Sequence, residues 1–148
     1  MSSDLGNPLD GVRILELGQI IAGTYGSQVL TDLGAEVIKI EPPKGDLGRN
    51  PSVAPYKGMS GLFLTFNRNK KSVVIDLKTD EGRELFYDLV RTADVVIDNF
   101  RSGVLKRLKV DYENLSKGLI EFKNVLYLLS FSVFFTAATR LVLISRKW

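Results

Sequence analysis

The sequence predicts an α/β fold, in which an open, mostly parallel sheet is flanked by helices. Two observations support this prediction. Short apolar runs typical of buried strands alternate with segments whose apolar residues recur at helical spacing. The first two of these runs also start 24 residues apart with a helical segment between them, which is the crossover that a parallel pair of strands requires.

The first strand–helix–strand unit spans residues 12 to 40. Val12 to Leu17 and Glu36 to Ile40 are predicted as its two strands, because each is a short run rich in apolar residues. The helix between them is expected to end at Gly34, which suits the left-handed conformation that often closes a helix. The apolar residues of this helix share one face, the pattern of a helix that packs by that face: Tyr25, Val29, Leu30 and Leu33.

A second unit follows a loop rich in Pro and Gly, residues 41 to 55, which we expect to be mobile or to cover a ligand. Val73 to Leu77 is predicted as the next strand and Asp94 to Asp98 as the last. Thr79 is predicted to cap the intervening helix, although Gly82 stands where a full capping box needs Glu or Gln. The expected buried face of this helix consists of Leu85, Phe86, Leu89 and Val90.

Composition limits the chemistry of the chain. Its 148 residues are enough for one substantial core but too few for two ordinary domains. The sequence has no Cys and no His, which excludes disulfides, thiolate nucleophiles, Ser-His-Asp triads and the usual zinc sites, and no metal is expected. The net charge of +3 is too small for a dedicated nucleic-acid binder. The first residues lack the basic and apolar regions of a secretory signal, which predicts a cytoplasmic protein.

Ligands of open α/β sheets bind outside the carboxyl ends of the strands, so that the segments of interest follow Leu17, Ile40, Leu77 and Asp98. Three glycines after the first strand and Glu41 after the second invite comparison with a dinucleotide site. The glycines are spaced G-x-x-x-x-G-x-x-G rather than G-x-G-x-x-G, and ordinary turn glycines are the alternative. Four basic residues surround the third predicted strand and suggest an anionic partner: Arg68, Lys70, Lys71 and Lys78.

Two longer stretches resemble a known family. They read LDGVRILELGQIIAGTYGSQVLTDLGAEVIKIEPPKGDLGR and FNRNKKSVVIDLKTDEGRELFYDLVRTADVVIDNFRSGVLKRL, and they resemble the amino-terminal part of the family III CoA-transferases. That family includes formyl-CoA transferase and α-methylacyl-CoA racemase. The resemblance covers roughly residues 8 to 117. It implies that residues 1 to 117 are part of a Rossmann-like large domain, truncated relative to the family, that binds coenzyme A.

The resemblance also implies which residues meet coenzyme A. By position these candidates are Ile20, Ile21, Ala22, Ile75, Asn99, Phe100, Val104 and Arg107. Phe100 offers an apolar surface, and the guanidinium of Arg107 suits phosphate oxygens. Lys70, Lys71 and Arg101 are looser phosphate candidates. The alternative for each basic residue is an ordinary surface charge, above all for the two lysines that precede the strand, and for Asn99 it is the capping of a turn.

The reaction that the resemblance implies is transfer of coenzyme A between an acyl-CoA and a carboxylic acid, through attack of an Asp carboxylate on the thioester. The family's nucleophilic Asp matches no position of this chain, and Asp94 and Asp98 fit the ends of a strand better than a nucleophile's pocket. No catalytic residue is therefore assigned. The family's subunits form interlocked homodimers. The alternatives to an active transferase are a catalytically inactive module that binds CoA or a nucleotide, and a tail-anchored membrane protein that uses the preceding part as an interaction domain.

The resemblance ends near Lys117, and residues 118 to 148 form a divergent hydrophobic tail. We favour a reading frame disrupted near residue 117 as the explanation, because the change is abrupt. The alternatives are a diverged soluble element and a membrane anchor. Residues 125 to 145 are about long enough for a tilted transmembrane helix, but Arg140 would cost on the order of 2–3 kcal/mol near its centre.

Overall fold

A four-stranded parallel sheet organises the residues that the computed structural model describes, which are 6–51 and 55–116. Its strands are β1 (Arg13–Glu16), β2 (Glu36–Glu41), β5 (Lys71–Val74) and β6 (Val95–Ile97). They lie side by side in the order β5-β2-β1-β6, and each neighbouring pair is parallel. Counted along the chain, these strands have the order 3-2-1-4, which is the arrangement of a Rossmann sheet. The predicted fold class is confirmed.

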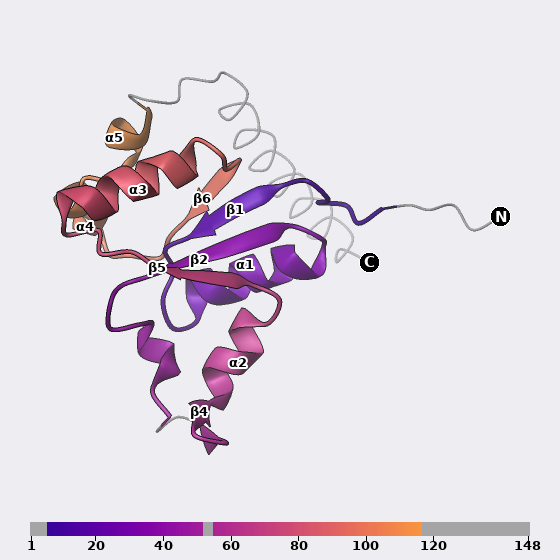
Figure 1. Ribbon diagram of the computed structural model, residues 1–148. Helices are drawn as coiled ribbons and strands as arrows, with labels where there is room; N and C mark the ends of the chain where they lie inside the picture. Colours follow the sequence, from indigo (N-terminus) through magenta and orange to yellow (C-terminus); the bar gives the residue numbers. More distant parts are fainter. Residues whose placement is uncertain (1–5, 52–54, 117–148) are drawn as a thin grey trace, which may run out of the picture. The chain divides into compact units, whose positions relative to one another are not determined.

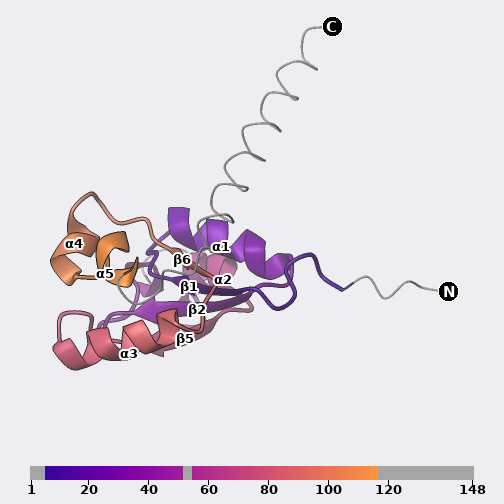
Figure 2. The ribbon, with the colours of Figure 1, turned by 90° about the horizontal axis from the view of Figure 1, so that it is seen from above.

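Helices cover both faces of the sheet (Figure 1). α1 (Ala22–Asp32) connects β1 to β2, and α2 (Gly61–Asn67) contacts α1 before the chain enters β5. α3 (Asp80–Val90) connects β5 to β6 and lies on the opposite face from α1 (Figure 2). The chain changes face here because β6 joins the sheet beside β1, on the far side from β5. Two short helices follow β6: α4 (Val104–Leu108) and α5 (Tyr112–Ser116).

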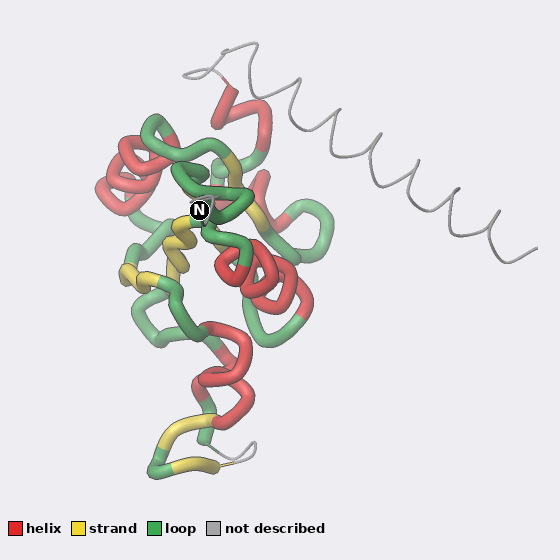
Figure 3. Tube along the Cα trace, turned by 90° about the vertical axis from the view of Figure 1, so that its right-hand side faces the viewer, coloured by secondary structure: helices red, strands yellow, loops and turns green. Residues whose placement is uncertain are grey.

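The segment between β2 and α2 contains a short 3-10 helix and a small hairpin. These are η1 (Leu47–Arg49), β3 (Pro55–Tyr56) and β4 (Met59–Ser60). Figure 3 shows the hairpin beyond the end of α2, away from the main sheet. The sequence predicted neither this hairpin nor α2, because both elements are too short to show a clear period of apolar residues.

β5 lies earlier in the sequence than predicted. It covers residues 71–74 rather than 73–77, so that Ile75, placed in the strand by the sequence, follows its last residue. The Ile75 N–H still donates to the carbonyl of Glu41 at 2.9 Å, and the chain then turns at Asp76, whose carbonyl accepts from the Thr79 N–H at 3.1 Å. Residues 75–78 therefore belong to the loop at the carboxyl edge of the sheet.

α3 confirms its predicted start and part of its predicted buried face. Thr79 accepts a hydrogen bond from the Gly82 N–H at 3.0 Å, and the first turn is acidic, as expected. Phe86 and Val90 are buried, and Leu89 is half-buried. Leu85 was predicted as buried and is 51% exposed. Successive helical side chains are about 100° apart, and the helix buries the ridge through Phe86 and Val90, which turns Leu85 away from the sheet.

α1 packs on the sheet by the face opposite to the predicted one. Its buried residues are Gly23, Thr24, Ser27 and Gln28. Of the four apolar residues that share a face, only Leu30 packs against the core, while Tyr25, Val29 and Leu33 are exposed. The polar face turns inward because charged side chains of Glu16, Lys39 and Lys70 are buried beneath it. The helix ends as predicted, with a positive φ of 101° at Gly34.

None of the helices within residues 6–51 and 55–116 is long and apolar enough to cross a lipid bilayer. The hydrophobic tail predicted for residues 118–148, with its candidate membrane segment at 125–145, lies outside the described residues. The domain boundary near residue 117 stays a prediction.

Candidate functional site

A pocket of about 490 Å³ opens at the carboxyl edge of the sheet. This is the edge at which ligands of open α/β sheets bind. Residues at or just after the ends of all four strands contribute to it, as the sequence led us to expect. The larger part of its wall is apolar and consists of Leu17, Ile40, Pro42, Ile75, Leu77, Phe100, Val104 and Leu108.

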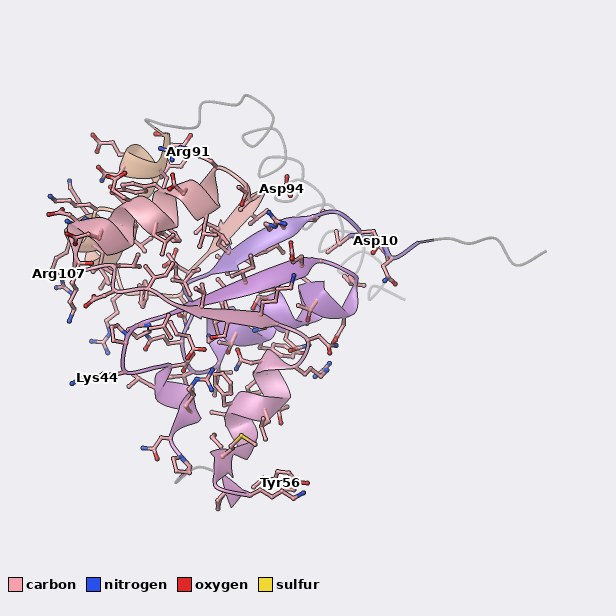
Figure 4. The ribbon with its side chains drawn as sticks, viewed as in Figure 1. Asp10, Lys44, Tyr56, Arg91, Asp94 and Arg107 are labelled. Atoms are coloured by element: carbon pink, nitrogen blue, oxygen red, sulfur yellow. The ribbon has the colours of Figure 1, made fainter. Side chains whose placement is uncertain are left out.

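Three cationic side chains line the same pocket. Lys78 follows β5, Arg83 lies in the first turns of α3, and Arg107 lies in α4. The guanidinium of Arg83 is anchored, because it donates to the carbonyls of Leu77 and Lys78 at 3.1 and 3.0 Å and pairs with Asp80. Lys78 and Arg107 are exposed and pair with no acidic side chain in the described part of the chain. Figure 4 shows Arg107, which belongs to α4, at the outer side of the molecule and apart from Arg91, which follows the last residue of α3.

Glu41 is an acidic residue of the pocket whose negative charge is neutralised by Arg49. Both of its carboxylate oxygens accept from Arg49 at 2.6 Å, and the Ser72 hydroxyl and the Asp46 N–H donate to it at 2.6 and 2.9 Å. Burial raises the pKa of Glu41, but these hydrogen bonds outweigh burial and lower the pKa to about 2. The Arg49 guanidinium in turn lies 3.9 Å from the ring centre of Phe63. Glu41 is therefore a fixed anion that Arg49 neutralises.

The pocket brings together four of the eight residues that the sequence proposed for coenzyme A. These are Ile75, Phe100, Val104 and Arg107. Ile20, Ile21 and Ala22 do not line it: Ile20 and Ile21 are exposed on the loop that leads from β1 into α1, and Ala22 is exposed at the start of α1. Whether any of the eight meets a ligand stays a prediction.

Asn99 joins the loops that follow β1 and β6. Its side-chain oxygen accepts from the Gln19 N–H at 3.0 Å, and its side-chain nitrogen donates to the Gln19 carbonyl at 2.9 Å. β1 and β6 are the adjacent strands at which the strand order reverses, the point where Rossmann-like sheets bind ligands. Gln19 lines the pocket although Asn99 does not, so that Asn99 acts on the pocket through the backbone of Gln19.

The basic residues around β5 have very different surroundings. The ammonium of Lys70 was considered as a surface charge or a phosphate ligand, and both interpretations are wrong, because its side chain is only 2% exposed. It donates to Glu16 and to the Thr24 carbonyl at 2.8 and 2.7 Å. Burial lowers the pKa of Lys70, and the contact with Glu16 opposes this effect. Lys71 is a surface residue paired with Glu36, and Arg68 pairs with Asp32.

Sequence reasoning missed four polar members of the pocket, which are Gln19, Asp76, Lys78 and Arg83. Lys78 was noted as one of several basic residues and directly follows Leu77, a predicted strand end, but it was not proposed as a ligand-binding residue. Gln19 adjoins the proposed residues after β1, while Arg83 shows no distinguishing signal in the sequence. Within the described residues, no cluster of acidic side chains is suited to hold a metal ion.

Comparisons with known proteins agree with the geometry. The family model described as CoA-transferase family III matches residues 9–119. Acetyl-CoA:oxalate CoA-transferase from Acetobacter aceti is 46% identical over 112 residues, which are 74% of this chain and 28% of that protein. Succinyl-CoA–D-citramalate CoA-transferase from Chloroflexus aurantiacus is 49% identical over 109 residues, which are 73% of this chain and 27% of that protein.

Solved structures show the same likeness. A CAIB/BAIF family protein from Brucella suis has 45% identity and a TM-score of 0.69, over 75% of this chain and 30% of that one. A hypothetical protein from Mycobacterium tuberculosis has 42% identity and a TM-score of 0.69, over 76% of this chain and 31% of that one. This chain thus spans somewhat more than a quarter of the length of its curated relatives.

Proposed function

Because this chain belongs to CoA-transferase family III, we propose that the pocket at the carboxyl edge of its sheet binds coenzyme A, either free or as an acyl-CoA. Proteins of this family act on CoA thioesters and carboxylic acids. The reaction that this pocket serves in the family is transfer of coenzyme A from an acyl-CoA to a carboxylic acid, and for the 148-residue chain itself we propose binding without transfer. The 148 residues span only part of the relatives' length, and the described part supplies substrate binding rather than the transferring carboxylate.

One observation favours coenzyme A above other ligands. The pocket combines an apolar wall with two exposed, unpaired cations among the described residues, Lys78 and Arg107. Coenzyme A matches this combination. Its phosphates suit the cations, and its long, weakly polar arm and its adenine ring suit the apolar wall. A volume of about 490 Å³ is in the usual range for small-molecule sites, and charge-assisted bonds to phosphate are among the strongest that a site can form.

Calorimetric titration of the full 148-residue chain with coenzyme A tests the proposal. We expect saturable binding, and we expect Arg107→Ala to weaken it by about tenfold, the effect of losing one charge-assisted hydrogen bond. Arg91→Ala is the matched control, because Arg91 pairs with Asp88 on the surface of α3 and does not line the pocket. Absence of binding at millimolar coenzyme A would refute the proposal, as would an equal loss in the two variants.

Transfer itself is tested separately from binding. The full chain is mixed with acetyl-CoA or succinyl-CoA and with oxalate or D-citramalate, the compounds for which the relatives are named. We expect no transfer, because the family's nucleophilic Asp matches no position of this chain and the Glu41 carboxylate in the pocket is held by Arg49 and Ser72. Formation of a new thioester would show that the chain contains a nucleophile after all, and Asp76→Asn would identify or exclude the one in the pocket.

A further inference from the structure

Ile20 adopts an unusual backbone conformation beside the proposed site. Its φ is +66°, in the left-handed region that β-branched residues rarely occupy. Three other residues besides glycines have a positive φ in the described part of the chain, but none of them is β-branched: Lys57, Asn69 and Lys109. A conformation of this kind persists only where the surroundings enforce it.

The carboxylate of Asp46 contacts the Ile20 backbone directly. Its Oδ1 accepts from the Ile20 N–H at 3.2 Å and from the Gly48 N–H at 2.5 Å. Its Oδ2 lies 2.7 Å from the ammonium of Lys39, and both side chains are only 1% exposed. Asp46 is therefore a buried anion, fixed by Lys39 on one side and directed at the Ile20 backbone on the other.

The residues before Ile20 are held in the same way. Lys39 donates to the Gly18 carbonyl at 2.7 Å, and Asn99 binds both the N–H and the carbonyl of Gln19. Three consecutive backbone positions are thus fixed by side chains from three separate segments. Because Gln19 lines the pocket, this arrangement sets one part of the pocket wall before any ligand arrives.

We propose that Asp46, supported by Lys39, is a positioning residue that keeps Ile20 in the left-handed conformation and thereby presents the neighbouring Gln19 to the ligand in a preformed loop. The inference rests on the proposed function only for its effect on binding. A preformed loop strengthens binding because the ligand does not have to order it. Without Asp46, Ile20 relaxes to an extended conformation, and the path of the chain between β1 and α1 changes.

A double-mutant comparison in the full chain separates positioning from a general structural role. Asp46→Ala is expected to weaken coenzyme A binding about tenfold in the otherwise unaltered chain. In a chain that also carries Ile20→Gly, the same change should weaken binding less than about threefold, because glycine adopts a positive φ without steric cost. An equal loss in both backgrounds would overturn the proposal, because the effect of Asp46 would then not pass through Ile20.

Hydrogen exchange of the Ile20 amide in the unliganded protein provides a readout that does not depend on coenzyme A. We expect Asp46→Ala to raise its exchange rate at least tenfold. The control, Asp32→Ala, removes an exposed carboxylate paired with Arg68 and should leave this rate unchanged. If the unaltered chain fails to bind coenzyme A, the proposed function fails, and this exchange rate alone decides whether Asp46 holds Ile20. No rise in the rate would refute that role.

Asp46→Asn replaces Asp46→Ala if the latter does not fold. It preserves the shape of the side chain and leaves a neutral oxygen to accept from Ile20, while it removes the charge opposite Lys39. We expect the same pattern at smaller amplitude: a loss of binding of about threefold, abolished by Ile20→Gly, and a faster exchange of the Ile20 amide. Unchanged binding together with unchanged exchange would contradict the proposal.

Discussion

The carbonyl group of Asp76 occupies the space in which Gly82 would otherwise place a β-carbon. A β-carbon built at Gly82 lies 2.8 Å from the carbonyl carbon of Asp76, a separation that real β-carbons do not show. Asp76 belongs to the loop that lines the pocket, and Gly82 lies in the first turn of α3. The glycine that interrupts the capping box in the sequence therefore allows the helix to approach the pocket wall.

Gly82→Ala is expected to destabilise the protein although alanine is the better helix former. Helix propensity alone favours alanine by about 1 kcal/mol. The methyl group, however, forces the Asp76 backbone or the start of α3 to move, and overpacking of this kind costs typically 1–3 kcal/mol. We expect a net loss of about 1 kcal/mol in the free energy of unfolding, measured by urea denaturation.

Gly26→Ala is the matched control in α1. A β-carbon at Gly26 meets no atom within 4 Å, and the residue is exposed in the middle of a helix. Only the propensity difference acts there, and a gain of up to about 1 kcal/mol is expected. If both variants shifted stability in the same direction, the close approach of Asp76 would not be the cause of the effect at Gly82.

Because α1 packs by its polar face, substitution of Ser27 should lower the stability of the protein more than substitution of Val29. The buried hydroxyl of Ser27 donates to Glu16 at 2.7 Å, and Ser27→Ala should cost about 1–3 kcal/mol, because it leaves a buried carboxylate oxygen with one donor fewer. Val29 is 41% exposed, and Val29→Ala should change stability by no more than about 0.5 kcal/mol. Thermal unfolding of the two variants compares their stabilities. A larger loss of stability for Val29→Ala than for Ser27→Ala would contradict the burial of the polar face of α1.

The sequence predicted the alternation of strands and helices, because each strand has its own apolar run and each crossover its own helical period. It predicted the wrong face of α1 because apolar periodicity treats every charge as exposed. Glu16 reaches partners at Lys39 and Lys70, which are 23 and 54 positions away in the chain. These ion pairs form only when β1 and β2 are paired and the start of β5 lies next to them. No local sequence pattern predicts them.

The position of the pocket followed from strand ends, whereas of its three cations only Arg107 had been proposed, on the ground of the resemblance. The rule for parallel sheets needs only the order of the strands, and the pocket indeed lies at the carboxyl ends of β1, β2, β5 and β6. Lys70 precedes the strand and Lys78 follows it with the predicted bounds as well as with the observed ones. The sequence did not show that the Lys70 ammonium is buried, because its partners Glu16 and Thr24 lie 54 and 46 positions away in the chain.

Lys70 and its neighbour Lys71 provide a direct test of the buried charges. Lys70→Met removes the donor to Glu16 and to the Thr24 carbonyl in a region sealed from water, and we expect a loss of about 3 kcal/mol. Lys71→Met removes an ammonium that is 71% exposed and pairs with Glu36, which should change stability by less than about 1 kcal/mol. Urea denaturation of both variants gives the comparison, and similar losses would show that Lys70 is not buried in solution.

Glu41 predicts how the stability of the protein depends on pH. Its pKa falls from the ordinary value of 4.5 to about 2 in the folded state: burial acts to raise it, but the hydrogen bonds from Arg49, Ser72 and the Asp46 N–H prevail. Since the folded state releases this proton more readily than the unfolded state, the stabilisation is complete above pH 4.5 and is lost as the pH falls toward 2. A shift of this size corresponds to a contribution on the order of 3 kcal/mol.

Comparison with Glu41→Gln isolates this contribution from that of the other carboxylates, such as Glu36, whose pKa is also lowered by its bonds to Lys71 and Arg13. Groups other than Glu41 titrate alike in the two proteins, so that the difference between their free energies of unfolding reports the Glu41 charge alone. We expect that difference to be constant from about pH 7 to pH 5 and to shrink steadily below the ordinary Glu pKa. Urea denaturation at a series of pH values measures it. A difference that stayed constant down to the acid limit of folding would mean that the Glu41 pKa is not lowered, and Arg49 would then not hold the loop after β2 through this carboxylate.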